Sequence, residues 1–260
     1  MPSKPSSLPS SYLWLGLSFA AAGLGIFLLT RGKRLSRRAL PERYQLVDAD
    51  TGEHRSFWHD IPLRGSDGKF MFVTEIPRGV HARYELEPET SDIANDPRGT
   101  KAIEKLGSGP CFNYGFLPQT WSDPVDWHDN ITGLRGDGDP LDLIEISGKH
   151  LSPGEVAQVQ ILGAVCLIDE GAADWKLIGT ACCKPLTDKE TANEMVKVKA
   201  WMDSYKALFA KEPTKWYLDG MIFDRTIALD LVDQQHKVWL KKKGASASRA
   251  SSKNYKVVTK

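Results

Sequence analysis

Acidic residues are missing from both ends of the chain, and their absence divides the 260-residue sequence into three parts. Residues 1–41 and 241–260 contain no Asp or Glu, but they hold thirteen of the 34 Lys and Arg. All 33 acids therefore lie in residues 42–240, where they leave a net charge of −12. An acidic globule repels phosphate backbones, so the sequence argues against nucleic-acid binding and favours divalent cations as partners.

Cysteine is scarce, and none of the four residues is spaced as Cys-x-x-Cys. This pattern excludes both a zinc knuckle and a disulfide scaffold. If the adjacent Cys182 and Cys183 lie on a strand, they point to opposite faces. We therefore interpret this pair, together with Cys111 and Cys166, as reduced and mostly buried thiols in a reducing compartment.

Charge is also missing from Tyr12–Thr30, a run long enough to cross a bilayer as a helix. Five basic residues follow between Arg31 and Arg38, and such residues stay on the cytoplasmic or matrix side. Residues 1–41 thus form a predicted membrane anchor with the globule facing the cytoplasm or the mitochondrial matrix. The alternative is a cleaved targeting segment and a soluble protein in mitochondria or another organelle. Secretion is less favoured, because the charges follow the apolar run.

Residues 42–243 form the predicted folded domain. Short apolar runs predict a hairpin between 70–73 and 83–86, a strand over 141–146, a buried strand over 156–168, and a return strand over 175–183 after a turn at 169–174. Strands at this spacing favour a mainly β fold with helices, built around a small closed barrel or a sandwich.

The last third of the domain is predicted to be helical. Thr187 and Glu190 have the spacing of a capping box, from which a helix could run to about Phe209. A second helix is indicated by an apolar stripe over 227–239 that we expect to pack on the core. Residues 244–260 have the composition of a basic, disordered tail.

Three carboxylates lie within six positions of the segment Gly136–Asp142. The side chains of Asp137, Asp139 and Asp142 would repel one another unless cations neutralise them, and hard oxygen ligands on a short loop suit Mg²⁺. A calcium-binding helix–loop–helix would need a different spacing and a flanking helix, whereas here the chain continues into a strand. The segment therefore predicts a magnesium site.

The same segment carries a family resemblance. Asp-Gly-Asp-Pro-Leu-Asp-Leu, at 137–143, resembles the signature of the soluble family I inorganic pyrophosphatases, and the helix over 228–239 resembles the closing helix of that family. The likeness covers roughly 55–240 and is closer to the eukaryotic branch. Four further segments agree in the family's order: Glu75-Ile76-Pro77-Arg78; Asn113-Tyr114-Gly115 with Pro118-Gln119-Thr120-Trp121; Asp169-Glu170-Gly171 with Asp174-Trp175-Lys176; and Trp201 with Tyr205-Lys206.

The resemblance implies an OB-like barrel, pyrophosphate as the substrate and a role for each carboxylate. Asp139 would accept the proton of the attacking water. The remaining acids would act on metal ions: Asp137, Asp142 and Asp174 as ligands of the activating ions, Asp169 and Glu85 as ligands of ions that arrive with the substrate, and Glu75 as a support behind them. Bound metal ions activate water and neutralise the charge of the leaving phosphate.

The resemblance also implies an anion-binding side. Its charges would come from Arg83, Lys176 and Lys206, and its hydroxyl donors from Tyr114 and Tyr205. On the predicted strand, Arg83 and Glu85 are two residues apart and share a face.

Three departures from the family pattern bear on these expectations. Arg83 replaces the usual Lys, and its planar fork is not equivalent to an ammonium. The stretch 91–112 lacks a clear phosphate-binding Arg, which leaves Arg98 or Lys101 to take that role. Gly79 stands where eukaryotic members often carry a Trp at the dimer contact, so the homodimer is less well supported than the activity.

Two other functions stay open from the sequence alone. One is a membrane-tethered, non-catalytic binding module, although Asp139, Asp142 and Lys176 are all retained. The other is a phosphohydrolase for a different diphosphate, which a charge-dense site with little aromatic lining would not favour.

Overall fold

The computed structural model describes residues 41–182, 186–210, 213–243 and 254–260, all within one compact unit, Leu40–Lys260. Among these residues no helix is both long and apolar enough to cross a bilayer. The predicted membrane anchor at 12–30 lies outside the described residues.

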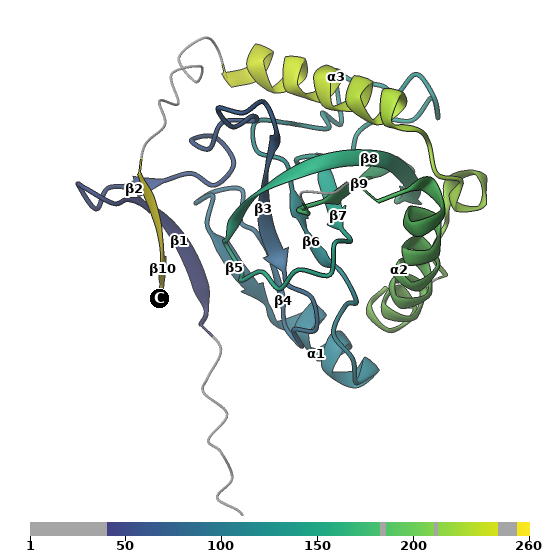
Figure 1. Cartoon of the computed structure of the whole chain (residues 1–260), viewed down its shortest axis with the longest axis horizontal. Helices are drawn as coiled ribbons and strands as arrows, with labels where there is room; N and C mark the ends of the chain where they lie inside the picture. Colours follow the sequence, from purple (N-terminus) through teal and green to yellow (C-terminus); the bar gives the residue numbers. More distant parts are fainter. Residues whose placement is uncertain (1–40, 183–185, 211–212, 244–253) are drawn as a thin grey trace, which may run out of the picture. The chain divides into compact units, whose positions relative to one another are not determined.

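A closed β-barrel forms the centre of the domain (Figure 1). Its strand order is β3-β6-β7-β9-β8, and only the β7–β9 pair is parallel. The barrel predicted from the strand spacing is therefore confirmed, and five strands are the number typical of OB folds. The five strands are β3 (Phe70–Ile76), β6 (Asn113–Phe116), β7 (Asp142–Glu145), β8 (Val156–Asp169) and β9 (Ala172–Thr180).

The hairpin of β8 and β9 turns more tightly than the sequence suggested. Only Glu170 and Gly171 separate the strands, with φ angles of 49° and 79°. Two successive positive φ values are typical of the turns that match the twist of paired strands. Strand β9 thus begins three residues before the predicted start, Trp175, which is buried in the barrel core.

The predicted hairpin between β3 and β4 (Arg83–Leu86) is wrong. Both edges of β3 are already paired, with β6 and β8, so a closed barrel leaves it no edge for a further strand. Strand β4 pairs instead with β5 (Ile93–Asp96) in a second sheet of order β10-β1-β5-β4. In that sheet, β1 spans Arg43–Asp48 and also pairs with the short β2, His54–Arg55.

The predicted disordered tail is also wrong for its last residues. Strand β10 (Tyr255–Thr259) pairs antiparallel with β1, whereas 244–253 lie outside the described residues. Alternate side chains explain the pairing, because Tyr255 and Val257 pack on the apolar cluster of this sheet beside Leu46. The strand was not predicted from the sequence, because the basic composition of the tail as a whole is typical of disorder.

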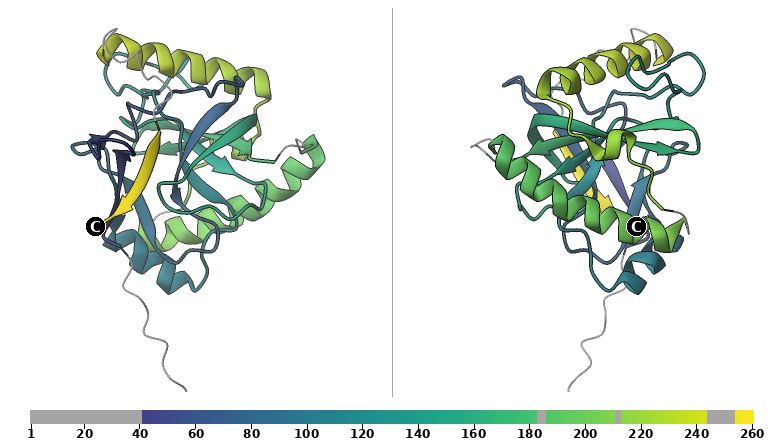
Figure 2. Two further views of the ribbon diagram at one scale, coloured as in Figure 1. Left: turned by 60° about the vertical axis from the view of Figure 1, so that its left-hand side comes forward. Right: turned by 90° about the vertical axis from the view of Figure 1, so that its right-hand side faces the viewer.

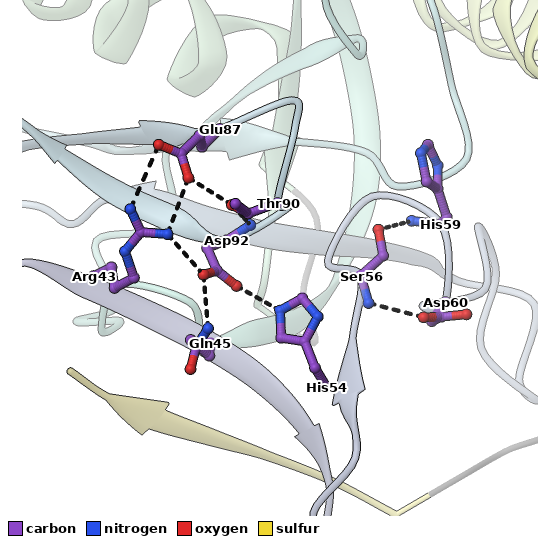
Figure 3. A network of polar contacts seen from close by, with 9 residues as sticks. All are labelled: Arg43, Gln45, His54, Ser56, His59, Asp60, Glu87, Thr90 and Asp92. Atoms are coloured by element: carbon purple, nitrogen blue, oxygen red, sulfur yellow. Dashed lines mark hydrogen bonds and ion pairs between the residues drawn. The ribbon is translucent and has the colours of Figure 1, made fainter.

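A buried carboxylate ties the strands of the second sheet together (Figure 3). Asp92 is only 1% exposed and accepts hydrogen bonds from Arg43 (3.0 Å) and Gln45 (2.8 Å), with His54 Nε2 at 2.7 Å. Burial alone would raise its pKa, but the bonds from His54, Gln45 and Arg43 hold the pKa of Asp92 below its usual value. This network joins β1 and β2 to the residue that precedes β5.

In the described part of the chain, three α-helices pack on these sheets (Figure 2). Helix α2 (Asp188–Phe209) begins at the predicted capping box, which is confirmed by bonds between Thr187 and Glu190 in both directions. Helix α3 (Arg225–Lys243) covers β8 and buries the predicted apolar stripe, including Trp239. Helix α1 (Pro97–Leu106), which the sequence analysis missed, is capped by Asp96 and packs against α2; a short 3₁₀ turn, η1, spans Tyr217–Gly220.

Candidate active site

The predicted signature lines a polar cavity of about 390 Å³, here called the carboxylate pocket. It lies where β7 and β9 begin, beside the loop that precedes β7. Strand pairing explains the convergence, because β7 and β9 are parallel with Asp142 opposite Lys176. Six carboxylates line the pocket together with Tyr114, Arg83, Lys176 and Arg135: Asp137, Asp139, Asp142, Asp169, Glu170 and Asp174.

The loop that carries the first two carboxylates is tightly fixed. A Cβ atom on Gly136 would lie 2.4 Å from the backbone of Ser122, so no larger residue fits there. Gly138 has a φ of 95°, its N–H donates to Ser122 O at 2.8 Å, and its carbonyl accepts from Trp121 Nε1 at 3.0 Å. The loop is therefore anchored on both sides of Asp137.

Lys176 lies at the centre of a buried cluster of charges. Its side chain is 6% exposed, and Nζ lies 2.5 Å from Asp142 Oδ2 and also contacts Asp174. Tyr114 donates its hydroxyl hydrogen to the same Asp142 oxygen at 2.6 Å. Asp174 and Lys176 share one face of β9 because they are two residues apart, with Trp175 turned into the core between them.

Crowding of like charges changes the protonation of these groups. Partial desolvation, with repulsion from Asp174, raises the pKa of Asp137 to about 9, and desolvation with repulsion from Asp142 raises the pKa of Asp139 to about 6. Burial raises the pKa of Asp142 as well, although Lys176 opposes that shift. Burial would lower the pKa of Lys176, but Asp142 and Asp174 raise it well above its usual value.

The donor set of this pocket fits divalent cations. Within the described ranges, no three His, Cys, Asp or Glu side chains already form a metal cage. Basic side chains instead neutralise several of the acids, as Lys176 does for Asp142 and Asp174. Among the residues that the structure describes, Asp137 and Asp139 have no such basic partner. Crowding raises the pKa of both carboxyl groups, and a bound divalent cation would relieve their repulsion.

The remaining predicted residues lie around this centre. Arg83 donates to the Tyr205 hydroxyl at 3.1 Å and lies 2.8 Å from Glu85. Glu85 itself does not line the carboxylate pocket. Lys206 forms an ion pair with Asp169 across the gap between α2 and the end of β8.

Glu75 lies behind the carboxylate pocket instead of lining it. It is buried on β3 and accepts a hydrogen bond from the backbone N–H of Leu86 at 2.6 Å. Burial and the nearby charge of Asp142 raise its pKa well above the usual value.

Arg98 does not join the site. Its guanidinium donates to the carbonyl of Phe209 at 3.0 Å and lies 4.4 Å from the centre of the Phe209 ring. Arg98 does not line the carboxylate pocket. The reason is the unexpected helix α1, which packs on α2 and directs Arg98 to the end of that helix. Lys101, the other candidate, is exposed on α1 and also lies outside the carboxylate pocket.

A second cavity of about 160 Å³, here called the aromatic pocket, adjoins the first and was not expected. The two pockets share Arg83, Tyr114, Asp169, Asp174 and Lys176. The expectation of little aromatic lining is therefore wrong. Local spacing could not reveal these rings, because strand β6 and helix α2 are brought together only by the fold. The aromatic residues that line this second cavity are Phe112, Tyr114, Trp201, Tyr205 and Phe209.

Comparison with known proteins decides the family. Residues 72–240 match the family model described as inorganic pyrophosphatase. The chain belongs to this family. It is 31% identical to the soluble inorganic pyrophosphatase 1, chloroplastic, of Chlamydomonas reinhardtii, over 83% of this chain and 79% of that protein. Mouse inorganic pyrophosphatase 2, mitochondrial, is 34% identical over 72% of this chain and 66% of its own length.

Solved structures agree with this assignment. The crystal structure of type I inorganic pyrophosphatase from Toxoplasma gondii superposes with a TM-score of 0.63 at 30% identity, covering 77% of this chain and 93% of the other. The OB-like barrel expected from the resemblance is thereby confirmed, and so is the enzyme class: a hydrolase that acts on a phosphoric anhydride bond.

Proposed function

We propose that this chain hydrolyses pyrophosphate to two phosphates with Mg²⁺ held in the carboxylate pocket. The observation that carries the proposal is the convergence of Asp137, Asp139, Asp142 and Asp174 on one cavity that also contains basic groups. When bound there, Mg²⁺ would lower the pKa of a coordinated water and neutralise phosphate charge. The side chains of the pocket would position the ions, the attacking water and the phosphate groups.

Asp137, Asp142 and Asp174 are proposed to hold the activating ions. Asp142 would be the ligand shared between ions, because Lys176 contacts both it and Asp174 and its strand pairs with that of Asp174. On ion binding, Lys176 would give up its bonds to these two acids and become available to a phosphate oxygen, while Tyr114 stays within reach. Asp169 and Glu85 are proposed ligands for ions that enter with the substrate.

Asp139 is the proposed proton acceptor. It lies on the same short loop as Asp137, lines the pocket and has no basic partner among the described residues. A carboxylate that is not committed to an ion pair can orient a water and take its proton. Arg83 lines both pockets, and Lys206 and Tyr205 line the adjoining aromatic pocket, so all three are proposed to bind the phosphoryl oxygens.

The test is phosphate release from pyrophosphate by the purified protein, in Mg²⁺, in chelator, and in Mg²⁺ with excess Ca²⁺. We expect turnover with Mg²⁺ only and inhibition by Ca²⁺, because the larger ion coordinates more loosely and activates water less well. Equal rates in chelator and in Mg²⁺ would refute the metal role.

We further propose that the protein resides at or in an organelle, with residues 42–243 as its catalytic domain. The apolar run at 12–30 supports a membrane anchor, and the names of the mitochondrial and chloroplastic relatives support an organelle. Alkaline carbonate extraction separates the two forms of this proposal. Full-length protein in the pellet supports the anchor, whereas a soluble product shortened by about the length of the segment would mean cleavage. A homodimer remains a prediction.

A further inference from the structure

Arg135 brings a guanidinium to the wall of the carboxylate pocket without using it on a neighbour. Three basic side chains line this pocket: Arg83, Arg135 and Lys176. Lys176 is bound by Asp142 and Asp174, and Arg83 by acids and a tyrosine. The side chain of Arg135 makes no hydrogen bond or ion pair in the part of the chain that the structure describes, although six acids line the same pocket.

The backbone of Arg135 is nevertheless firmly placed. It forms one β-bridge with His128 and another with Ala172, where strand β9 begins. Its carbonyl accepts a hydrogen bond from Ala173 at 2.9 Å, and the next residue is the closely packed Gly136. An exposed side chain on a fixed backbone is thereby held beside the carboxylates, with its donors free.

The chemistry of a free guanidinium in this place selects its partner. Arginine has five N–H donors in a planar fork and binds phosphate oxygens in pairs. Metal ions bound to the neighbouring carboxylates would occupy the carboxylate oxygens. The guanidinium of Arg135 would then have the phosphate anion as its partner. Arg98, one of the two residues that the sequence offered for this task, donates to the carbonyl of Phe209 instead.

We propose that Arg135 is a substrate-binding residue that donates hydrogen bonds to the phosphoryl oxygens of a diphosphate held in the carboxylate pocket. The inference rests on the proposed function, since it takes pyrophosphate as the occupant. It adds a third basic group to the lining of the carboxylate pocket, beside Arg83 and Lys176.

Binding and turnover of the Arg135→Gln and Arg135→Met variants test the proposal. The probe is methylenediphosphonate, a diphosphate that cannot be hydrolysed, titrated calorimetrically into the full-length protein in Mg²⁺. Loss of charged hydrogen bonds should weaken its binding about 10- to 100-fold and raise the KM for pyrophosphate by a similar factor. Arg135→Lys, which keeps the charge but not the fork, should fall between these variants and the wild type.

Arg64→Gln is the matched control, because it removes another exposed arginine that does not line the pocket. Arg64 lies 3.8 Å from the centre of the Phe70 ring and donates to the Gly68 carbonyl, so its loss should leave probe binding unchanged.

An unchanged affinity for methylenediphosphonate in both Arg135→Gln and Arg135→Met would overturn the proposal. Tighter Mg²⁺ binding with no change for the probe would overturn it as well, since Arg135 would then act only on the carboxylates. Failure of the proposed function gives a different result: wild-type protein that binds the probe but releases no phosphate from pyrophosphate, while the Arg135 variants still bind the probe more weakly.

Discussion

At the scale of single residues, the site separates carboxylates that are bound by cations from those that are not. Lys176 and Tyr114 hold Asp142, whereas Asp139 faces the pocket with no basic partner among the described residues. The two acids, three positions apart in sequence, therefore have different surroundings. We expect different consequences when each loses its charge.

Asp142→Asn should lose most Mg²⁺ affinity, because a central ligand is removed, and nearly all activity with it. Asp139→Asn should keep Mg²⁺ binding but lose turnover by about 10²- to 10⁴-fold, the usual contribution of a positioned base. Calorimetric Mg²⁺ titration beside steady-state kinetics distinguishes the two. If both variants bind Mg²⁺ equally poorly, the roles assigned here are wrong.

At the scale of the elements, the second sheet is held together by a buried hydrogen-bond network as well as by its apolar core. Strands β1 and β2 converge on Asp92, a buried acid that holds three partners (Figure 3). A buried carboxylate with satisfied bonds fixes how the strands meet, and its loss leaves those partners unsatisfied. The barrel, by contrast, is held mainly by its apolar interior.

Asp92→Asn should therefore destabilise the protein by about 1.5–3 kcal/mol, the range for hydrogen bonds to charged groups. Because the folded-state pKa of Asp92 is lowered, its contribution is present above the unfolded pKa and is lost as the pH falls through the folded value. Urea unfolding at pH 7 and at acid pH measures both effects. Asp67→Asn, which changes only exposed contacts with Lys69 and Gln158, is the control and should change stability little.

At the scale of the whole molecule, the folded domain carries a net negative charge, and its acidic side chains are crowded in the carboxylate pocket. The net charge of −12 over 42–240 and the crowded acids both favour cation binding. The raised pKa values of Asp137 and Asp139 mean that the metal-free folded protein holds protons that the unfolded chain has already released. Stability without metal should therefore depend on pH.

In chelator, the Tm should fall as the pH rises from 6 to 9. Between the unfolded pKa near 4 and the folded values of about 6 for Asp139 and about 9 for Asp137, the folded state binds more protons, so rising pH favours unfolding. Saturating Mg²⁺ should raise the Tm and flatten this dependence. A flat or rising Tm in chelator would contradict the charge crowding, and Asp137→Asn should reduce the slope.

Features with a local physical origin were predictable from the sequence. The capping box of α2 depends on residues three apart, and the stripe of α3 on a helical period, so both were correct. The carboxylate signature could be found for the same reason, because its loop is short and its glycines have local roles. The spacing of the strands predicted a barrel or a sandwich, and the signature with its companion segments predicted the acidic site and the family.

Features that depend on which edges and faces meet were decided only by the tertiary structure. Strands β3 and β4 could not pair because the barrel had already used both edges of β3, and β10 found the free edge of β1 instead. Arg98 and Arg135 carry the same guanidinium, yet α1 directs one toward Phe209 while two β-bridges hold the other at the pocket. Sequence spacing specifies the face of an element on which a residue lies, whereas the neighbour that meets this face depends on contacts between residues far apart in the chain.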